Sequence, residues 1–405
     1  MISLSLTAAR NLQLAAQGLL HPAKSKASKA EVLACIRRMG VLQIDTISVV
    51  ARSPYLVLWS RLGDYPLNWL DQHLAEKNLF EYWSHEACFI PIEHFGRYRH
   101  QMLQPDNMGW KLNQSWQLEN AKHIQQVLTH IKKNGACRSA DFVGNTEKNN
   151  GWWDWKPEKR SLEVLFTTGQ VMVDRRQGFQ RVYDLTERVH PTWQDQRDLG
   201  KRAHDEENQV LDAVRALGIT QAQWIADYFR MKKLAHKLSA QALADRGLLQ
   251  VVRVEGWQED FYVHPAHKDL LNQAQAGQLK ASLTTLLSPF DPIVWDRKRA
   301  LDFFHFDYKI ECYTPQSKRQ YGYFTLPILR RGKLIGRIDA KAHRKIGVME
   351  IKALHLEAEV NFSEALGLDL KRVLKRFSDW HATPELQIGY CSDAGLRQFL
   401  TGTAT

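Results

Sequence analysis

The sequence predicts an α+β protein with three tandem winged-helix (helix-turn-helix-like) domains followed by a C-terminal β-barrel. Three observations predict this class. An order of helices, a glycine stop and a strand pair recurs along the first part of the chain. Turn formers and aromatic residues then become dense from Ser288, and strand-like segments with a basic turn follow. We place the domains at residues 1–110, 111–200, 201–283 and 284–405.

The first predicted domain starts with two helices. Thr7 is expected to cap a helix with one apolar stripe. Ser28 is expected to start the next helix, because Glu31 three residues later completes a capping box. Gly40 supplies the stop. The chain then continues as a predicted strand, Val41–Asp45.

This strand carries the first candidate for chemistry. Side chains alternate between two faces of a strand, so Gln43 and Asp45 are expected on one face, with Leu42 and Ile44 on the other. A carboxylate beside an amide can activate and orient a water molecule. The pair can equally be the polar side of an ordinary surface strand, and the segment by itself leaves both interpretations open.

The rest of the first domain adds a helix and a polar strand. Proline at position 54 suits the first turn of a helix. The segment Glu81–Ala87 is expected to be one strand, and it carries His85 and Glu86. This histidine and this glutamate are candidates either for supporting a pocket or for a structural hydrogen-bonded pair.

The second predicted domain shows the winged-helix order most clearly. Helices are expected over 119–133, at Ser139 and over 157–168, and a hairpin over 171–185. Its turn contains Arg175 and Arg176. In winged helices the third helix can enter a DNA groove while the hairpin contacts the backbone, so we predict that these arginines bind phosphates. Winged helices also pair proteins, and the arginines could be an ordinary solvated turn.

The third predicted domain repeats this order and leads into a basic sheet. Its helices are expected over 205–217, 221–229 and 234–246, and its strands over 248–254 and 261–263. The C-terminal strands are expected at Tyr308–Tyr313, Tyr321–Leu329, Lys333–Ala340 and Val348–Leu356. Arg330, Arg331 and Lys333 surround a hairpin turn and are candidate DNA contacts. These strands are expected to form a small β-barrel or a curved sheet, and a helix over 364–379 is expected to close this domain.

Composition favours an anionic partner inside a reducing compartment. Lysine and arginine exceed aspartate and glutamate by 11, and nucleic acid is the commonest partner of such a chain. Five cysteines are scattered without a C-x-x-C pair, which fits a reducing cytoplasm. No signal peptide is recognised, and no apolar run approaches the about 18 residues of a membrane helix.

The motifs of several enzyme classes are missing from the sequence. It contains no P-loop, no G-x-G-x-x-G and no G-x-S-x-G, so nucleotide-driven and serine-hydrolase functions lack support, and no cofactor is expected. His264 and His267 have a spacing that suits a metal, but no third ligand is near them in sequence. We therefore expect a structural pair and no metal site.

Four segments in order resemble a known family: Gly40–Asp45, Tyr82–Ala87, Ser288–Pro292, and the hairpin from Tyr321-Gly322-Tyr323 to Gly336-Arg337-Ile338-Asp339. Together they resemble the AlkZ/YcaQ family of bacterial DNA glycosylases, over nearly the whole chain. One branch of that family has Gln-x-Gln at the catalytic position. This chain has Gln43-x-Asp45, which is similar to the YcaQ (AlkX) branch and its broader acceptance of alkylated bases.

The resemblance implies tandem winged helices, a C-terminal barrel, and excision of N-alkylated purines with unhooking of interstrand crosslinks. It implies that Asp45 and Gln43 are catalytic. The absence of lysine from the motif predicts a monofunctional enzyme, because a Schiff base needs an amine nucleophile. The expected partner is damaged double-stranded DNA, bound by a monomer in the cytoplasm, at the nucleoid.

Two other functions fit the same elements. A winged-helix transcriptional regulator without catalytic activity would bind undamaged DNA in a sequence-specific way. A winged-helix assembly protein would bind its partner without sensitivity to salt. Base release from alkylated DNA distinguishes all three.

Overall fold

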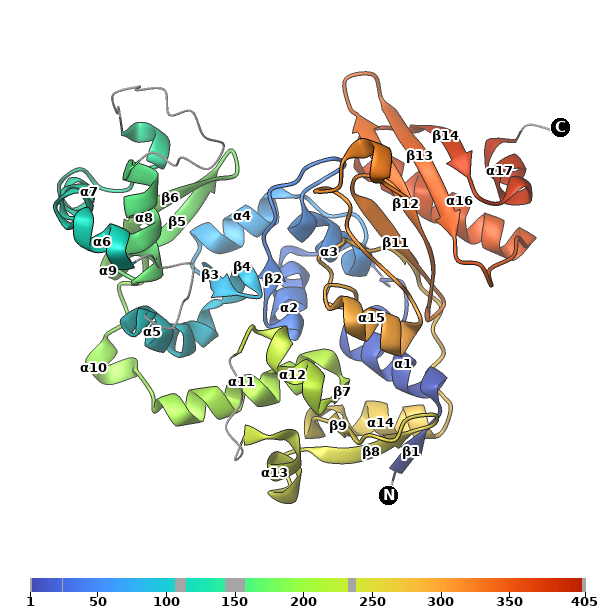
Figure 1. Cartoon of the computed structure of the whole chain (residues 1–405), viewed down its shortest axis with the longest axis horizontal. Helices are drawn as coiled ribbons and strands as arrows, with labels where there is room; N and C mark the ends of the chain where they lie inside the picture. Colours follow the sequence, from blue (N-terminus) through green and yellow to red (C-terminus); the bar gives the residue numbers. More distant parts are fainter. Residues whose placement is uncertain (1, 24, 106–113, 143–156, 232–237, 403–405) are drawn as a thin grey trace. The chain divides into compact units, whose positions relative to one another are not determined.

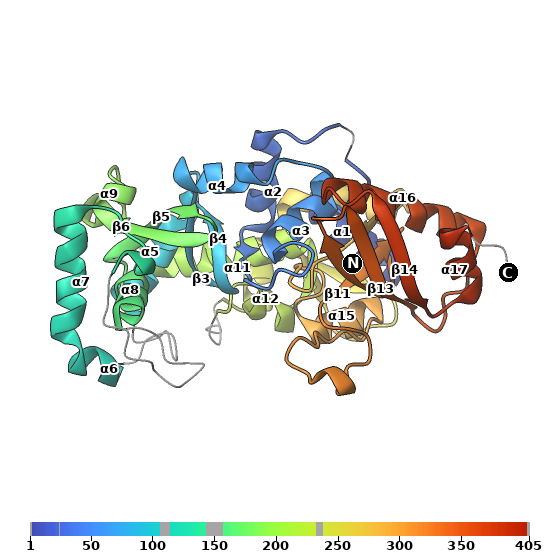
Figure 2. The same cartoon turned by 90° about the horizontal axis from the view of Figure 1, so that it is seen from above.

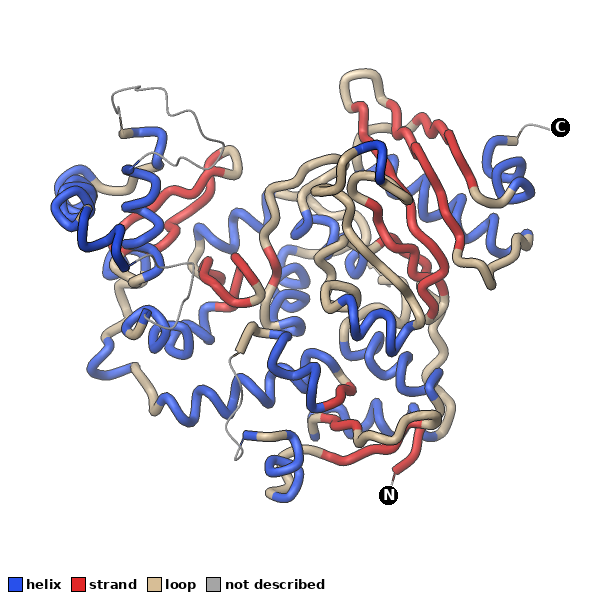
Figure 3. Tube along the Cα trace, viewed as in Figure 1, coloured by secondary structure: helices blue, strands red, loops and turns tan. Residues whose placement is uncertain are grey.

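The computed structural model describes residues 2–23, 25–105, 114–142, 157–231 and 238–402 (Figure 1). The chain forms two compact units, one made of Met1–Pro66 with Val210–Thr405 and the other of Leu67–Gln209. Helices and strands are mixed in both, as the blue and red segments of Figure 3 show, which confirms the α+β class. The four predicted domain ranges are finer than this division and stay a prediction.

The first unit contains a four-stranded sheet that joins the start of the chain to its middle. Its strand order is β1-β8-β9-β7. The N-terminal strand β1 (Ile2–Leu4) pairs in parallel with β8 (Gln250–Val254). β8 and β7 (Ile219–Gln221) both pair antiparallel with β9 (Phe261–Val263). An apolar core beneath this sheet combines Leu12, Phe261 and Phe303 with other buried side chains, and such burial is the main favourable contribution to folding.

Where the structure describes them, the helices of this unit largely follow the expected ranges, and the start of the expected 234–246 helix lies outside the described residues. Ser28 and Glu31 form the predicted capping box, and Gly40 ends the helix with a φ of 74°. Ser5, and not Thr7, caps the first helix, since its hydroxyl accepts a hydrogen bond from the amide of Ala8. The helices are α1 (Leu6–Ala16), α2 (Lys29–Met39), α3 (Ser53–Leu62), α11 (Arg202–Leu217, which begins in the other unit), α12 (Ala222–Tyr228), α13 (Ala240–Asp245), α14 (Lys268–Gln275), α15 (Arg297–Phe304), α16 (Glu364–Trp380) and α17 (Ala394–Thr401).

The C-terminal part is a five-stranded sheet of order β10-β11-β12-β13-β14. Its strands are β10 (Thr284–Leu286), β11 (Thr325–Arg330), β12 (Lys333–His343), β13 (Val348–Leu356) and β14 (Glu385–Cys391). Within the residues placed by the structure, β10 and β14 are edge strands and do not pair, so the predicted closed barrel is wrong. The helix α16 packs against both edge strands, in place of a pairing between them. Figure 2 shows this helix beside β14.

One predicted strand of this region does not form. Tyr308–Tyr313 belongs to an irregular connection that runs from α15 to β11 and contains the short 3₁₀ helix η6 (Gln316–Lys318). Tyr308 is buried and its hydroxyl donates to the carbonyl of Thr325 at 2.5 Å, so an aromatic residue that suggested a strand anchors a loop instead.

In its described residues, the second unit contains two hairpins and several helices. The predicted single strand Glu81–Ala87 is in fact a hairpin, because the chain reverses at His85 and Glu86 has a φ of 61°. The predicted order of helix, short helix, helix and hairpin over 119–185 is present. The elements are α4 (Asn68–Ala75), β3 (Leu79–Ser84), β4 (Glu86–Pro91), η1 (Ile92–His94), α5 (Phe95–Leu103), α6 (Gln114–Glu119), α7 (Ala121–Asn134), η3 (Ser139–Asp141), α8 (Pro157–Thr167), β5 (Val171–Gln177), β6 (Gln180–Leu185), α9 (Thr186–Val189) and α10 (Asp195–Asp198).

Candidate active site

The end of α2 fixes where the candidate segment begins. Gly40 takes a left-handed conformation, and a Cβ atom there would lie 3.0 Å from the ring of Phe229, so glycine is required for both reasons. The neighbouring Tyr228 donates its hydroxyl to the carbonyl of Met39 at 2.8 Å. Val41 and Leu42 are then fully buried. The segment therefore leaves α2 in a fixed direction. Val41 and Leu42 anchor it in the apolar core.

Gln43 and Asp45 differ in environment more than the strand pattern predicted. The strand β2 (Leu42–Gln43) ends before Asp45, so the alternation of faces stops there. Gln43 is only 6 % exposed, and it does not lie on a solvated face. Asp45 is half-buried. The amide of Gln43 thus lies in the protein interior. The carboxylate of Asp45, two residues later, lies at its boundary with solvent.

The carboxylate of Asp45 is oriented by its own backbone. Its Oδ1 accepts a hydrogen bond from the amide of Ile47 at 2.7 Å, an Asx turn that ends the extended run. Among the residues that the structure describes, Oδ2 has no hydrogen-bond partner. Burial raises the pKa of Asp45 above its ordinary value, and the Ile47 amide opposes that rise only in part. A fixed carboxylate with one open oxygen and raised basicity is suited to bind and activate water.

The loop after Asp45 is held by an arginine from the C-terminal sheet. Arg344, just beyond β12, donates to the carbonyl of Val50 at 2.5 Å and to Nδ1 of His381 at 3.1 Å. Burial, followed by the charge of Arg344, lowers the pKa of His381 to about 3. His381 is therefore a neutral acceptor at physiological pH, and the geometry of the loop does not depend on its titration.

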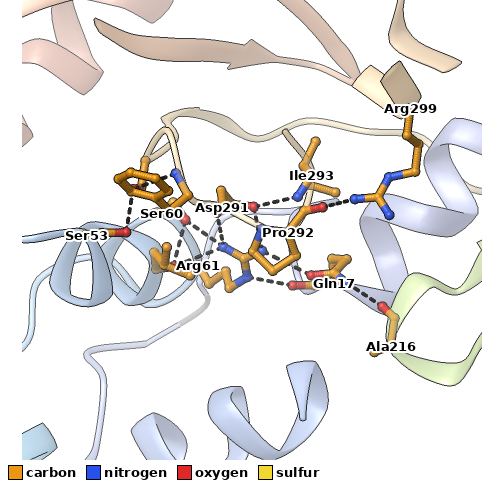
Figure 4. A network of polar contacts seen from close by, with 12 residues as sticks. Gln17, Ser53, Ser60, Arg61, Ala216, Asp291, Pro292, Ile293 and Arg299 are labelled. Atoms are coloured by element: carbon orange, nitrogen blue, oxygen red, sulfur yellow. Dashed lines mark hydrogen bonds and ion pairs between the residues drawn. The ribbon is translucent and has the colours of Figure 1, made fainter. Parts of the chain in front are cut away.

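A buried ion pair fixes the position of α3, the helix that follows this loop. Arg61 near the end of α3 makes a bidentate pair with Asp291 at 2.6 and 3.0 Å, with side chains 1 % and 0 % exposed (Figure 4). Burial alone would lower the pKa of Arg61, but the carboxylate beside it outweighs that effect and raises it. Ser53 at the start of α3 and Ser288 share a hydroxyl–hydroxyl hydrogen bond of 2.7 Å. Both ends of α3 are thus tied to the Ser288–Pro292 turn.

The charge of Asp45 affects the pKa values of two residues in the connection between α15 and β11. The charge of Asp45 contributes to raising the pKa values of both Cys312 and Tyr313, after the larger effect of burial. Cys312 is half-buried, whereas Tyr313 is 88 % exposed. The charge of Asp45 is thus felt by two groups of the connection between α15 and β11. The sequence pattern predicted a strand over Tyr308–Tyr313 and gave no signal for a role of either residue.

The other proposed pocket residues lie in the second unit. His85 is 3 % exposed at the turn of the β3–β4 hairpin, and its carbonyl accepts the thiol of Cys88 at 3.2 Å. Glu86 is half-buried in the left-handed conformation noted above. Their support of a pocket stays a prediction.

The two arginines of the β5–β6 hairpin have different surroundings. Arg176 is bound to the buried carboxylate of Glu81 at 2.5 and 2.8 Å, and its guanidinium lies 4.2 Å from the ring centroid of Phe179. Its side chain is 4 % exposed. Arg175 is 49 % exposed and pairs with Asp174. In this arrangement Arg176 is engaged inside its unit, and only Arg175 presents its charge to solvent.

The β11–β12 turn is basic and exposed. Arg330 and Arg331 both contact Asp369, at 2.8 and 3.0 Å, and Arg331 is 53 % exposed. Lys333 is exposed. The carboxylate of Asp369 also pairs with Arg372 at 4.0 Å, so it is shared among three arginines. The turn therefore keeps a net positive charge that suits a phosphate backbone. Contact with DNA at these residues stays a prediction.

The expected structural role of the two histidines agrees with their hydrogen bonds. His264 accepts from the amide of Ala266 at 3.1 Å, and His267 donates to the carbonyl of Arg215 at 2.7 Å. Over the described ranges, no three histidine, cysteine or acidic side chains gather as a metal site would need. None of the helices there is long and apolar enough to cross a membrane.

The residues that sequence reasoning missed left a weak signal. Arg61 is the only charged residue of α3, whose other side chains are mostly apolar and buried. A lone charge in such a helix indicates a buried partner. Nothing in the sequence indicated that the partner would be Asp291, 230 residues later.

Comparisons with known proteins show the family and the fold of the chain. The family model "DNA glycosylase AlkZ-like" matches residues 36–380, which includes both the Gln43–Asp45 segment and the Ser288–Pro292 turn. The solved structure of the Streptomyces sahachiroi DNA glycosylase AlkZ is similar with a TM-score of 0.63 and 13 % identity, over 96 % of this chain and 100 % of that chain. That likeness concerns the fold, and the family match covers most of the sequence. The chain therefore belongs to the AlkZ-like family of DNA glycosylases, enzymes that hydrolyse N-glycosyl bonds in DNA repair.

Proposed function

We propose that this DNA glycosylase removes N-alkylated purines, N7-alkylguanine in particular, with Asp45 as the residue that activates water. The observation that carries the proposal is the environment of Asp45, whose carboxylate is half-buried, anchored by Ile47 through one oxygen, and raised in pKa. The proposal extends the family assignment to a lesion class and to named residues.

Hydrolysis of the N-glycosyl bond at such a lesion requires little more than this carboxylate. Alkylation at N7 places a positive charge on guanine, so the base leaves without a general acid. The sugar then becomes oxocarbenium-like and needs a negative charge beside it and a water molecule to attack it. Asp45 supplies the charge and accepts the proton of the water, while Gln43 orients that water.

The same segment supports a monofunctional enzyme. No lysine occurs between Gly40 and Arg52, so the motif offers no amine for a Schiff base that would lead to strand cleavage. The expected product is an abasic site in an intact strand.

Unhooking of interstrand crosslinks is the second part of the proposal. A guanine that is tied to the opposite strand cannot rotate freely into a deep pocket, so the reacting sugar must reach the carboxylate in an open site. The partial exposure of Asp45 supports this role, and a sealed carboxylate would have argued against it.

The rest of the fold is proposed to hold the duplex. We interpret the helix–helix–hairpin segments as three winged helices, and we propose that Arg175 and the turn with Arg331 and Lys333 contact phosphates. We also propose that the protein acts as a monomer in the cytoplasm, at the nucleoid when bound to DNA. Membership of a glycosylase family does not favour the alternative of a regulator without activity.

The test is base release from a duplex with N7-methylguanine under single turnover. Asp45→Asn is expected to lower the rate at saturating enzyme by at least about a hundredfold, because it removes both the charge and the proton acceptor. The matched control is Asp307→Asn, since Asp307 is an exposed aspartate of the α15–β11 connection. Equal rates for Asp45→Asn and wild type at saturating enzyme overturn the assignment. A duplex with an N7–N7 guanine crosslink, run in parallel, tests unhooking separately.

A further inference from the structure

Two buried backbone carbonyls lie at the ends of residues 39–50, the Asp45 segment. Met39 ends α2 at 0 % exposure, and Val50 lies at 1 % exposure in the loop before α3. A carbonyl that is buried without a partner costs free energy, so each of these two needs a donor inside the protein. In both cases the donor is a side chain from a distant part of the chain.

Tyr228 supplies the donor at the first end. Its hydroxyl donates to the carbonyl of Met39 at 2.8 Å, across 189 positions of the sequence. That carbonyl belongs to the last turn of α2, where a helix offers no partner of its own. The ring of Tyr228 packs against Trp295 and Phe229, at centroid distances of 5.2 and 4.9 Å. These ring contacts place the hydroxyl group, whose bond then fixes the end of α2.

Arg344 supplies the donor at the second end. Its Nη2 donates to the carbonyl of Val50 at 2.5 Å, across 294 positions, and also to Nδ1 of His381 at 3.1 Å. The ring of His381 is itself fixed, because it packs on Phe377 and Trp380 at centroid distances of 4.5 and 4.7 Å. The guanidinium is therefore held by an acceptor at the end of α16 while it binds the loop.

The chain between these two ends depends on them for its position. From Ile44 to Arg52 it has no regular secondary structure, and Asp45 lies within this irregular stretch. The bond from the Ile47 amide orients the Asp45 carboxylate relative to its own loop, but it does not place the loop in the protein. Loss of a donor at either end leaves a buried carbonyl unsatisfied, so the loop is expected to shift toward water.

We propose that Tyr228 and Arg344 are positioning residues, which hold the two ends of the Asp45 segment and so keep its carboxylate in place against the reacting sugar. The inference rests on the proposed role of Asp45. Both side chains act through the backbone in this role and need not touch the substrate. Their effect should appear in the rate of the bound complex, because displacement of a reacting group by about 1 Å can cost about a hundredfold.

Two variants remove the donors, and two controls remove bonds of the same kind elsewhere in the same unit. Tyr228→Phe loses one hydroxyl group and keeps the ring, and Arg344→Met loses the guanidinium and keeps an aliphatic stem. Tyr262→Phe is the control for the first, because the hydroxyl of Tyr262 donates to the side chain of Gln241 at 3.2 Å. Arg253→Met is the control for the second, because Arg253 donates to a backbone carbonyl at 2.6 Å.

Two measurements separate rate, affinity and local order. Single-turnover base release from a duplex with N7-methylguanine, over a range of enzyme concentrations, gives the saturating rate and the half-saturating concentration. Hydrogen–deuterium exchange of the free protein, in peptides that cover residues 39–50, reports how firmly the Asp45 segment is held. Circular dichroism of each variant is expected to match wild type, since each substitution removes the bonds of one side chain.

Positioning predicts that both variants lower the saturating rate by about ten- to a hundredfold and leave the half-saturating concentration unchanged. It also predicts faster exchange of the Asp45 segment in both variants, and wild-type behaviour in both controls. An unchanged saturating rate or unchanged exchange in either variant overturns the role of that residue. Equal losses in the controls overturn the inference, since any lost bond would then have the same effect.

A contact between Arg344 and DNA is the main competing role, and the same data identify it. In that case Arg344→Met raises the half-saturating concentration and leaves the saturating rate unchanged, which overturns the positioning role of Arg344.

Failure of the proposed function looks different in these experiments. If wild-type protein releases no base, or if Asp45→Asn releases it at the wild-type rate, the role of Asp45 is wrong. The exchange measurement needs no substrate, so it still decides whether Tyr228 and Arg344 hold the segment. If Asp45→Asn is slow while Tyr228→Phe and Arg344→Met keep the wild-type rate, the role of Asp45 stands and this inference fails.

Discussion

Replacing Arg61 with methionine is expected to cost about 3–5 kcal/mol of stability, the range for removing one partner of a buried ion pair. The guanidinium makes six hydrogen bonds, two to Asp291, two to Gln17, and one each to Val57 and Ser60. Without it, the fully buried carboxylate of Asp291 keeps, among the described residues, only the hydrogen bond from the amide of Ile293, at 3.0 Å. The large cost arises from this uncompensated buried charge.

The double variant Arg61→Met/Asp291→Leu separates that penalty from the value of the pair itself. It removes both charges and leaves apolar groups of similar size, so it is expected to be much less destabilised than either single variant. A large loss of stability in Arg61→Met and a much smaller loss in the double variant would show that the cost comes from the uncompensated buried charge. Lys298→Met is the matched control, because Lys298 forms an exposed ion pair with Asp302 and should cost no more than about 1 kcal/mol.

Urea denaturation followed by circular dichroism gives the free energy of unfolding for each variant. Hydrogen–deuterium exchange of peptides from α1 and α3 then locates the loss, which should concentrate at these two helices because Arg61 joins them through Gln17. If Arg61→Met loses less than about 1 kcal/mol of unfolding free energy, or no more than Lys298→Met, the ion pair with Asp291 does not stabilise α3 as the geometry indicates.

Three further outcomes are expected. Because burial raises the pKa of Asp45 and its charged form is the active one, the acid limb of kcat/KM for base release should lie at higher pH than an ordinary aspartate would give, and a limb at or below that value contradicts the assignment. The raised pKa also means that the folded state holds the proton more tightly than the unfolded state, so stability is lost as pH rises through the folded pKa. Asp45→Asn should therefore raise the Tm slightly at neutral pH, and a lower Tm would show that the ionised carboxylate is stabilising. Arg175→Gln should flatten the salt dependence of DNA binding by up to about 0.9 in the slope of log affinity against log salt concentration. Arg176→Gln should mainly lower stability, because it breaks the pair with Glu81. Identical slopes for wild type and Arg175→Gln would place the DNA elsewhere.

Local structure was predicted well where the sequence carries a local signal. The capping box of Ser28 and Glu31, the stop at Gly40 and the hairpin after α8 are set by interactions between near neighbours in the chain. Such signals do not depend on the remainder of the fold. The same holds for the Gln43–Asp45 motif as a pattern.

The environment of that motif could not be predicted in the same way. Alternation placed Gln43 and Asp45 on one polar face, but β2 stops at Gln43 and the amide is buried. Asp45 then turns on its own backbone through Ile47. Whether a residue is buried depends on distant segments that pack against it, and a local pattern does not contain that information.

The incorrect strand and the incorrect barrel have the same origin. Aromatic and β-branched residues over Tyr308–Tyr313 indicated a strand, but the side chain of Tyr308 reaches Thr325 and the segment becomes a loop. A closed barrel requires its first and last strands to pair, and α16 packs against both edge strands instead. Strand pairing is a long-range property, so the preferences of single segments do not decide it.

By itself the sequence determined the α+β class, most helix boundaries, the basic character and the family to which the chain is similar, because each follows from composition or from neighbouring residues. Only the tertiary structure showed that Arg61 meets Asp291 and that Arg344 holds Val50. Those contacts join residues more than 200 positions apart. Their formation depends on how the whole unit buries its apolar surface, which no local stretch of the chain specifies.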